Sequence, residues 1–445
     1  MKYFGTDGIR GVANEMLTPE IAFELGRVIG ETSDLKKKVV IGKDSRISGD
    51  MLESAVVAGI TASGGDVYRV GVLPTPAVNY IVKKHNADYG IVISASHNPV
   101  IDNGIKVVDS DGKKISSELE EKIEKFIDGE IEISRKIAGR IGRVYDLEVA
   151  KSDYIEMLVD TVSVDSFDFK VVIDCANGAS SYVAPIVFNT FMKDVIYINN
   201  EPNGLNINDR CGSTNTKNLS EVVVEEKAHF GIAFDGDADR IIFVDGDGND
   251  IDGDYIIYIL VKKYLDENKL VNNAIALTTM SNLGVINNLK NELNVDVKIT
   301  DVGDKYVSHA LDKYNLNLGG ETSGHIILKD YAPSGDGILV ALQVLDYFKK
   351  SGNSLQNLIK SINKYPSVLV NVKVIDKDYS LNHRSVLEEI RRVENILEDS
   401  GRVLVRASGT EQMIRVLVEC EDGKNCIEYS NSISETIREL NEKVN

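Results

Sequence analysis

The sequence predicts an α/β protein with three related α/β domains that contain mixed sheets, followed by a smaller C-terminal α+β domain, around a central cleft. Three segments repeat the order strand, helix, strand, and each is followed by a further apolar strand that opens into a polar loop. The chain has 445 residues, more than one hydrophobic core usually supports. We therefore expect domains at residues 1–150, 151–252, 253–365 and 366–445.

The three repeats have the spacing of α/β units on parallel-biased sheets. Their expected strand, helix and strand are residues 39–44, 51–63 and 67–72, then 171–174, 182–191 and 195–198, then 274–277, 283–293 and 295–299. The further strands and their loops are residues 87–93 with 94–99, 228–234 with 235–240, and 315–318 with 319–325. Ligands lie at the carboxyl ends of such strands, so the three loops should converge on one cleft.

The C-terminal segment has a different pattern, with more strands than helices at its centre. We expect strands at residues 368–375, 402–406 and 413–419, a helix at 384–397, and a closing amphipathic helix at 425–441. This order predicts a smaller α+β domain.

Composition limits the partners of this chain. The formal net charge is −19, which disfavours nucleic acid and anionic membranes as partners. The N-terminus has no secretory h-region, and no apolar run is long enough to span a bilayer. Four scattered cysteines without a CxxC pair indicate reduced thiols in a cytoplasmic protein.

Three carboxylates alternate directly after the strand at 228–234. Asp235, Asp237 and Asp239 offer the hard oxygen ligands that suit Mg²⁺ or Ca²⁺. An EF-hand is excluded, because Arg240 and Gly246 stand where that loop needs glycine and glutamate. The alternative is a solvated acidic turn.

Ser96 follows the strand at 87–93 and is a candidate nucleophile. A serine in such a place is also a common helix cap or turn former. No G-x-S-x-G elbow surrounds it, so esterase chemistry is not indicated. A phosphoserine beside a metal is a different possibility, because the cation neutralises charge on a transferring phosphoryl group.

Two further loops carry candidate binding residues. Glu321 and Ser323 can hydrogen-bond sugar hydroxyls, and His325 can act as an acid or base or be an ordinary buried histidine. The second loop is a candidate phosphate clamp, or a polar turn between strands, and consists of Arg406, Ser408, Gly409 and Thr410 with Arg415 beyond it. Neither a P-loop nor a dinucleotide fingerprint is present, so a small phosphorylated molecule fits better than a nucleotide.

Five motifs in order resemble the α-D-phosphohexomutase family over essentially the whole chain. They are FGTDGIRG at 4–11, SASHNP at 94–99, DGDADR at 235–240, GETSGH at 320–325 and RASGTE at 406–411. Within the family, the opening motif is most similar to the phosphoglucosamine mutase branch. The resemblance implies four domains around a deep cleft and interconversion of glucosamine 6-phosphate and glucosamine 1-phosphate.

The resemblance also implies roles for individual residues. Ser96 is phosphorylated in the active enzyme, its phosphate and the three aspartates hold Mg²⁺, and a sugar 1,6-bisphosphate is the intermediate and activator. The remaining implied roles are proton transfer for Lys106 and His325, support of the reacting phosphate for Arg10 and Arg240, and substrate binding for Asp304, Lys305, Glu321 and Ser323. The implied partner is a phosphosugar, and the protein is a monomer or homodimer.

Some positions depart from the family pattern. Thr322 stands where glucosamine-specific members usually carry an amide, Lys305 replaces an arginine, Ala238 a glycine and Gln412 a proline. The departure at Thr322 bears on the sugar, so a mutase for mannose or glucose phosphate is an alternative, but none of these departures removes a proposed ligand or the nucleophile. Two separate alternatives are a metal-dependent phosphohydrolase that uses an aspartate as nucleophile and a phosphosugar-binding regulator.

Overall fold

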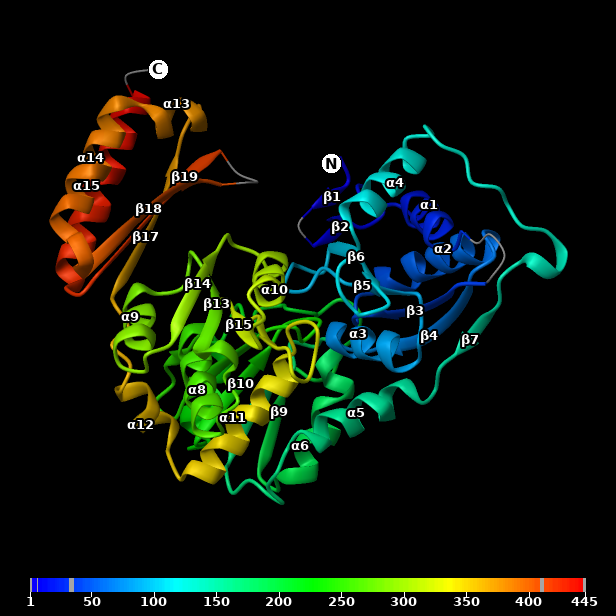
Figure 1. Ribbon diagram of the computed structural model, residues 1–445, viewed down its shortest axis with the longest axis horizontal. Coiled ribbons are helices and arrows are strands. Elements are labelled where there is room, and N and C mark those ends of the chain that lie inside the picture. The colour runs from blue at the N-terminus through cyan, green and yellow to red at the C-terminus, as the bar shows by residue number, and fades with distance from the viewer. Residues whose placement is uncertain (1, 6, 32–35, 409–411, 443–445) are drawn as a thin grey trace. The chain divides into compact units, whose positions relative to one another are not determined.

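The computed structural model describes residues 2–5, 7–31, 36–408 and 412–442 (Figure 1). Backbone contacts divide the chain into two compact units. The first unit contains Met1–Met280 and Val297–Leu358, and the second contains Ser281–Asp296 and Ile359–Asn445. Among the described residues, no helix has both the length and the apolarity that crossing a membrane requires.

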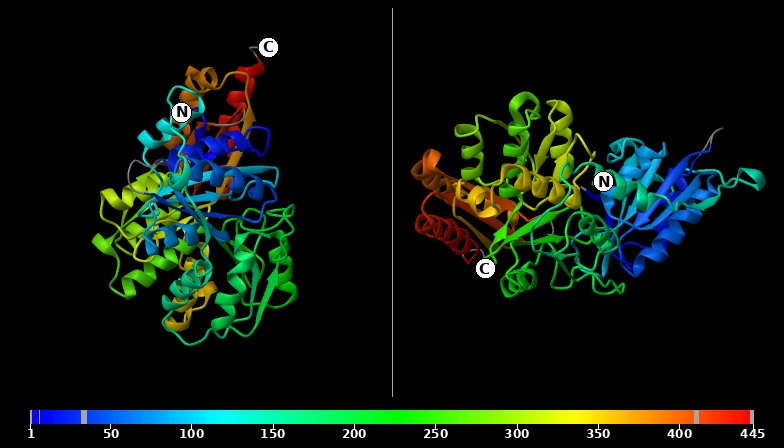
Figure 2. Two further views of the ribbon diagram at one scale, coloured as in Figure 1. Left: turned by 90° about the vertical axis from the view of Figure 1, so that its right-hand side faces the viewer. Right: turned by 90° about the horizontal axis from the view of Figure 1, so that it is seen from below.

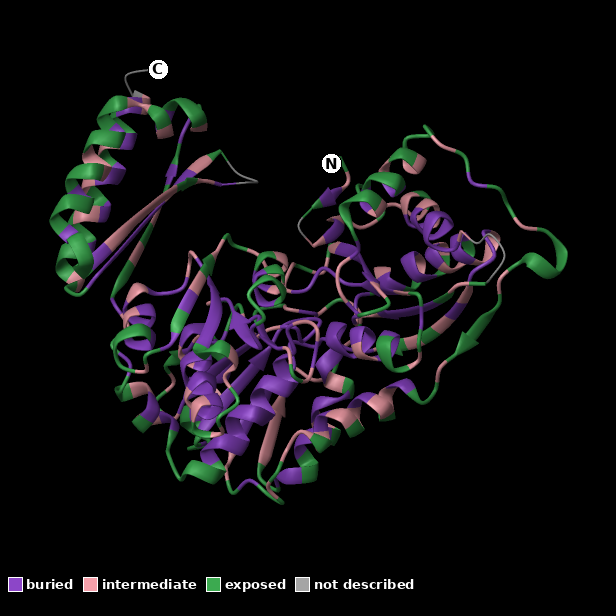
Figure 3. Ribbon diagram, in the orientation of Figure 1, coloured by how far each residue is buried: buried purple, intermediate pink, exposed green. Residues whose placement is uncertain are grey.

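The first sheet has seven strands in the order β1-β2-β6-β5-β3-β4-β7. Its elements are β1 Phe4–Gly5, β2 Gly8–Val12, α1 Pro19–Ile29, β3 Lys38–Lys43, α2 Ser48–Ala62, β4 Asp66–Val72, α3 Thr75–Lys84, β5 Tyr89–Ile93, β6 Asp102–Asp109, α4 Ser117–Ile127, the 3₁₀ turn Ala138–Arg140, β7 Val144–Asp146 and α5 Ala150–Asp160. Strands β5, β3, β4 and β7 are parallel, whereas β6 and β2 are antiparallel to their neighbours. Helices α2 and α3 lie on opposite faces, so β3 is buried between them (Figures 1 and 3).

The second sheet has five strands in the order β12-β11-β10-β8-β9. Its elements are β8 Val171–Asp174, the 3₁₀ turn Ala179–Tyr182, α6 Ala184–Phe191, β9 Val195–Ile198, α7 Lys217–Glu225, β10 Phe230–Phe234, β11 Ile241–Asp245 and β12 Asp250–Ile251. The central strand β8 is parallel to both neighbours, and β11 turns back antiparallel to β10. Every residue of β10 is buried, so this strand has a fully apolar sequence.

The third sheet has four strands in the order β14-β13-β15-β16. The elements of this stretch of chain are α8 Gly253–Asp266, the 3₁₀ turn Val271–Asn273, β13 Ala274–Thr278, α9 Leu283–Asn291, β14 Asp296–Thr300, α10 Asp304–Lys313, β15 Leu318–Gly320, β16 Ile326–Leu328, α11 Gly337–Ser351 and α12 Leu355–Lys360. The prediction of a strand at 315–318 is wrong in its bounds: the strand begins three residues later and ends two residues later, at 318–320. Gly319 and Gly320 belong to the strand because they pair with Ala276 and Leu277 of β13.

The second unit contains an antiparallel sheet in the order β17-β19-β18. Its elements, besides α9, are β17 Ser367–Lys373, α13 Lys377–Asn382, α14 Arg384–Leu397, the 3₁₀ turn Glu398–Ser400, β18 Gly401–Ala407, β19 Met413–Cys420 and α15 Gly423–Glu442. Helices α14 and α15 pack together beside this sheet (Figure 2). The fold-class prediction, three α/β domains with mixed sheets and a smaller C-terminal α+β domain, is confirmed for the architecture of each part.

The cysteine prediction is wrong for one pair. Cys420 and Cys426 form a disulfide, because the turn between β19 and α15 brings their Cα atoms to 5.7 Å. Cys175 and Cys211 are free and buried, as expected.

Candidate active site

Loops at the carboxyl ends of three strands meet within the first unit. The loop after β5 carries Ser96, the loop after β10 carries the three aspartates, and the loop after β15 carries His325. All of these side chains are buried, and Ser96 is 1% exposed. The sequence-predicted candidates of the first three loops are therefore brought together.

Ser96 has a backbone φ of +53°, which is unusual for a residue other than glycine. Its hydroxyl donates a hydrogen bond to Asp235 Oδ2 at 2.6 Å, and His97 Nδ1 lies 3.3 Å from Ser96 Oγ. Burial, with Arg240 and Arg10 nearby, lowers the pKa of His97 to about 4. The neighbour of the serine hydroxyl is therefore a neutral imidazole at physiological pH.

The three aspartates each offer one oxygen to a cluster whose ligand atoms lie within 4.8 Å of one another. Within the described part of the chain, Asp237 Oδ1 and Asp239 Oδ1 are buried without a hydrogen-bond partner. Burial and the charges of Asp239 and Asp237 raise the pKa of Asp235 well above its usual range. Buried, underpaired hard oxygens of like charge fit a divalent cation such as Mg²⁺, which would relieve their repulsion.

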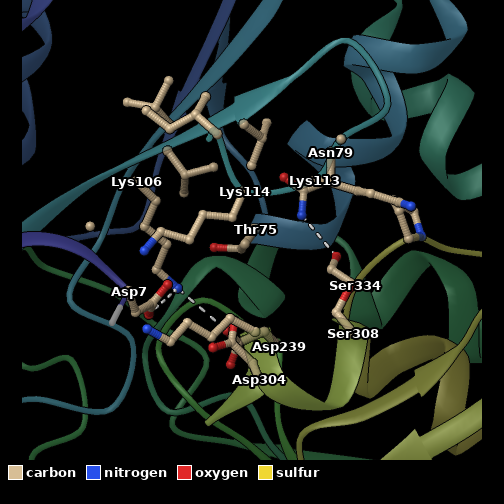
Figure 4. A pocket seen from close by; sticks show the side chains of 18 of the residues that line it. Asp7, Thr75, Asn79, Lys106, Lys113, Lys114, Asp239, Asp304, Ser308 and Ser334 are labelled. Atoms are coloured by element: carbon tan, nitrogen blue, oxygen red, sulfur yellow. Dashed lines mark hydrogen bonds and ion pairs between the residues drawn. The ribbon is translucent and has the colours of Figure 1, made fainter. Parts of the chain in front are cut away.

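Lys106 projects from β6 toward Asp7 and Asp239 (Figure 4). Its Nζ lies 3.0 Å from Asp7 Oδ2, 3.0 Å from Asp237 Oδ2 and 3.4 Å from Asp239 Oδ2. Burial opposes the charge of Lys106, but the carboxylates, led by Asp237, raise its pKa well above the usual value. The ammonium is therefore charged, and a cation at the aspartates would lower its pKa again.

Two further residues belong to this cluster and were not among the residues predicted from the sequence. Asp7 lies beside Lys106 and forms an ion pair with Arg10. Thr75, the first residue of α3, donates from its hydroxyl to Asp237 Oδ2 at 2.5 Å and from its backbone N–H to Asp237 O at 3.0 Å. Asp7 was visible inside the opening motif, whereas nothing in the sequence around Thr75 indicates a contact with the aspartate loop.

The loops of the second and third sheets are joined through their backbones. Arg240 and His325 form an isolated antiparallel bridge, and Ile241 N–H donates to Gly324 O at 3.1 Å. Gly324 has φ +88°, and a Cβ there would lie 1.9 Å from Ile241 O. This close approach fixes His325 beside the aspartates, and only glycine permits it.

His325 lies between an acid and a backbone donor. Its Nδ1 is 3.7 Å from Asp239 Oδ2, and Gly335 N–H donates to its Nε2 at 3.3 Å. Burial opposes protonation, but Asp239, Asp304 and Glu321 raise the pKa of His325 to about 9. The Gly335 contact needs a free lone pair on Nε2, so it favours the neutral ring with its proton on Nδ1. A cation at the aspartates would shift the ring toward this form.

The candidate substrate-binding residues of the third sheet differ in exposure. Glu321 is buried and accepts from Gly303 N–H at 3.0 Å, and Ser323 is exposed. Asp304 and Lys305 begin α10 and are partly exposed. Thr322 points its hydroxyl at Asp254 Oδ2, 3.0 Å away, and at Met280 O, 3.3 Å away.

Two arginines border the aspartates. Among the described residues, the Nε atoms of Arg10 and Arg240 are buried without a hydrogen-bond partner. Arg240 Nε lies 3.9 Å from Asp239 Oδ1. Guanidinium groups with unused donors are suited to phosphate oxygens.

A pocket of about 620 Å³ opens beside this cluster (Figure 4). Its lining includes Asp7, Lys106, Asp239, Asp304, Lys305 and His325. A volume of this size accommodates a small molecule such as a hexose phosphate.

The candidate phosphate clamp lies in the second unit. Arg406 and Arg415 face each other across strands β18 and β19, so two guanidinium groups share one face of the sheet. Arg406 is exposed, and Ser408 is 4% exposed. The other two predicted clamp residues, Gly409 and Thr410, lie outside the described residues. Like charges in register repel, so an anion between the two arginines would stabilise the pair.

Four family models match successive parts of the chain. The phosphoglucomutase/phosphomannomutase alpha/beta/alpha domains I, II and III match residues 1–133, 152–248 and 252–365, and the C-terminal domain of that family matches residues 369–434. The chain belongs to the α-D-phosphohexomutase family. The family prediction is thereby confirmed.

This phosphohexomutase is also similar to individual proteins over nearly its full length. It is 46% identical to the phosphoglucosamine mutase of Shouchella clausii, over 98% of this chain and 99% of that protein. It is 50% identical to the phosphoglucosamine mutase of Caldicellulosiruptor saccharolyticus, over 95% of both chains.

Solved structures share the fold. A phosphoglucomutase/phosphomannomutase family protein from Burkholderia thailandensis gives a TM-score of 0.81 at 22% identity, over 98% of this chain and 97% of that chain. The Aspergillus fumigatus N-acetylphosphoglucosamine mutase, solved with GlcNAc-6P and magnesium, gives 0.70 at 17% identity, over 99% and 96%.

Proposed function

We propose that this phosphohexomutase interconverts glucosamine 6-phosphate and glucosamine 1-phosphate through a phosphoserine at Ser96. The full-length identity to phosphoglucosamine mutases supports the substrate. The observation that carries the chemistry is the Ser96 hydroxyl, which donates to Asp235 at 2.6 Å inside a cluster of three aspartates. A phosphoryl group on that oxygen would lie next to the aspartates and Lys106.

The reaction consists of two phosphoryl transfers. In the first, the bond between phosphorus and Ser96 Oγ breaks and a bond to the free hydroxyl of the glucosamine monophosphate forms, which gives glucosamine 1,6-bisphosphate. The sugar hydroxyl loses its proton to a base, and Ser96 gains one. The bisphosphate then reorients, and its other phosphoryl group returns to Ser96, so the serine is phosphorylated again and the isomer is released.

The aspartates Asp235, Asp237 and Asp239, together with the phosphate on Ser96, would hold Mg²⁺. When bound, the ion neutralises charge that develops on the transferring phosphoryl group. Lys106 and His325 are the proposed proton carriers, since both lie within reach of the aspartate cluster. Arg10 and Arg240 would bind the reacting phosphate through donors that no described residue uses.

The remaining candidates are proposed to hold the substrate. Glu321 and Ser323 would bind sugar hydroxyls, and Asp304 and Lys305 would border the sugar from α10. The phosphate that is not reacting would bind Arg406, Ser408, Gly409, Thr410 and Arg415.

The test is turnover of glucosamine 6-phosphate by the purified protein with Mg²⁺ and a trace of sugar bisphosphate. We expect Ser96→Ala to lose on the order of 10⁴-fold or more in kcat, because the covalent route disappears. Ser54→Ala, an exposed serine of the same domain, should keep wild-type turnover. Chelation of Mg²⁺ should stop the reaction, and added Mg²⁺ should restore it.

Comparison among sugars separates the alternatives. A clear preference for mannose 6-phosphate would overturn the amino-sugar assignment, and steady release of inorganic phosphate by Ser96→Ala would indicate a hydrolase. Binding of the sugar phosphate without any turnover, even after priming with bisphosphate, would contradict the mutase proposal.

A further inference from the structure

The backbone of Ser96 adopts a conformation that must be held in place. Its φ of +53° lies in the left-handed region, which disfavours a residue with a Cβ. Such conformations persist where the surrounding structure over-determines them, and they cluster at functional sites. The groups that bind the peptide bonds on either side of Ser96 therefore decide where its hydroxyl points.

Arg46 binds most of this loop through one buried side chain. The side chain of Arg46 is 0% exposed. Its guanidinium donates to four backbone carbonyl oxygens, those of Ser96 at 3.0 Å, Asn98 at 2.8 Å, Pro99 at 2.5 Å and Asp102 at 3.0 Å. A planar fork with several fixed donors can hold a loop in this way, whereas a lysine ammonium cannot reach all four oxygens.

The same buried pair also binds the other side of Ser96. Asp44 accepts from Arg46 Nε at 2.9 Å and from the Ser94 hydroxyl at 2.6 Å. The Ser94 oxygen in turn accepts from the Ser96 backbone N–H at 2.9 Å. The N–H and the C=O of Ser96 are thus both tied to the Arg46–Asp44 pair.

Asn208, which lies in the next domain along the chain, also donates hydrogen bonds to this loop. Its Nδ2 donates to Ser96 O at 2.8 Å and to Asn98 O at 3.1 Å. Asn208 is only half-buried, whereas Arg46 is completely buried. Both side chains bind backbone carbonyl oxygens of this loop, and neither makes a hydrogen bond to the Ser96 hydroxyl.

We propose that Arg46, assisted by Asn208, is a positioning residue that holds the left-handed backbone of Ser96 and so aims its hydroxyl at Asp235. The inference rests on the proposed function for its catalytic consequence. Its structural content, that this guanidinium fixes the loop at residues 94–99, is independent of the substrate.

The experiment compares Arg46→Lys with wild type in hydrogen exchange and in kinetics. Lysine keeps the positive charge opposite Asp44 but lacks the planar guanidinium that donates to the four carbonyl oxygens. We expect the amides of residues 96–98 to exchange at least about 10-fold faster, since the loop opens more often. We also expect kcat to fall on the order of 10- to 100-fold, with KM for glucosamine 6-phosphate within about 3-fold, because a misplaced nucleophile costs rate rather than binding.

Arg27 provides a matched control in the same domain. It is 4% exposed, donates from Nε to the Ser63 hydroxyl at 2.8 Å, and binds the Ile133 carbonyl through Nη2. Arg27→Lys therefore removes an equally buried guanidinium that contacts backbone away from Ser96. It should keep wild-type exchange at residues 96–98 and wild-type kcat per folded molecule.

A folded Arg46→Lys with wild-type kcat would overturn the proposal. If Arg46→Lys does not fold, Asn208→Ala decides: faster exchange at residues 96–98 with a lower kcat supports the proposal, and wild-type behaviour overturns it. If wild-type protein turns over no hexose phosphate, the proposed function fails. The exchange comparison then still shows whether Arg46 holds the loop.

Discussion

The candidate active site in the first unit and the candidate phosphate clamp in the second unit differ in the burial of their charged groups. In the candidate active site, Lys106, Asp237 and Asp239 are buried and contact one another. In the second unit, Arg406 is exposed and faces the partly exposed Arg415 across two strands. The first arrangement fixes charges in a medium of low dielectric, and the second leaves charge accessible to an anion.

The difference suits two separate roles in the proposed reaction. Buried charges interact strongly, but they are stable only when a partner compensates each of them. Exposed charges are screened, and they contribute mainly when a ligand with several acceptor oxygens arrives. We therefore expect phosphoryl transfer to depend on residues of the first unit. We expect binding of the phosphate that is not reacting to depend on residues of the second unit.

Among the substitutions that test this contrast between the two units, the largest effect is expected for Lys106→Met. The substitution keeps the length of the side chain and removes its charge, so Asp7, Asp237 and Asp239 lose their shared partner. We expect kcat to fall on the order of 10³-fold, which is within the range for a lost acid or base. Steady-state kinetics with glucosamine 6-phosphate measures this.

Lys263 gives the control for Lys106. It is 2% exposed and contacts Asp346 Oδ2 at 2.9 Å and Glu267 Oε1 at 2.6 Å, outside the candidate site. Lys263→Met should lower stability, because Asp346 loses a buried partner, and leave kcat per folded molecule within about 2-fold. Equal losses of kcat in both variants would show that burial alone, and not position, accounts for the effect.

The second prediction concerns Asp336, a buried carboxyl whose hydrogen-bond donors among the described residues are neutral groups. Asp336 accepts from Tyr154 OH and Leu339 N–H, and burial raises its pKa to about 6. A raised pKa means that the folded state binds more protons than the unfolded state, so the free energy of unfolding falls as pH rises from about 4 to 6. Asp336→Asn removes this slope, and its stability relative to wild type should rise by about 2 kcal/mol between pH 4 and pH 7. Urea denaturation across this range checks it.

Asp376 is the matched carboxylate in the second unit. It also accepts a hydrogen bond at the start of a helix, from Tyr379 N–H, but it is exposed. Asp376→Asn is the exposed control, and its free energy of unfolding is compared with that of wild type in the same urea series. A slope as large as that of Asp336→Asn would break the contrast between the two units.

The smallest effect is expected for Arg406→Ala. Loss of one charge-assisted contact should raise KM for glucosamine 6-phosphate about 10-fold, with little change in the melting temperature. Arg384→Ala, which removes an exposed arginine of helix α14 in the same unit, should leave KM unchanged. A fall in kcat as large as that of Lys106→Met would refute the division between chemistry and capture.

Much of the fold was predictable because the sheets are regular. Strands such as 171–174, which is buried, and 195–198, which is half-buried, are short and mostly apolar runs, and their observed bounds equal the predicted ones. The loop chemistry was predictable because Ser96, Asp235 and His325 each follow such a strand. The shifted strand at 318–320 shows the limit, since Gly319 and Gly320 have the composition of a loop but pair as a strand.

The supporting residues were not predictable in the same way. Arg46 precedes Ser96 by 50 positions, and Asn208 follows it by 112. Both act on backbone carbonyl oxygens, which carry no residue-specific signal in the sequence. Only the folded chain reveals that an ordinary arginine, two residues after Asp44, binds the loop of the candidate nucleophile.

The backbone bridge between Arg240 and His325 has a consequence for how this protein can be recombined with its relatives. Because Gly324 has no Cβ, the backbone at Ile241 can lie directly against it. A Cβ on Gly253 would lie 2.2 Å from Glu321 O, so the start of α8 also packs against the loop that carries His325. In a chimera with a crossover between residues 240 and 325, the loop at Arg240 would come from one parent protein and the loop at His325 from the other. The two backbones would then not have evolved in contact with each other. The segment to exchange between relatives therefore contains both loops and the start of α8, and neither loop should be exchanged alone.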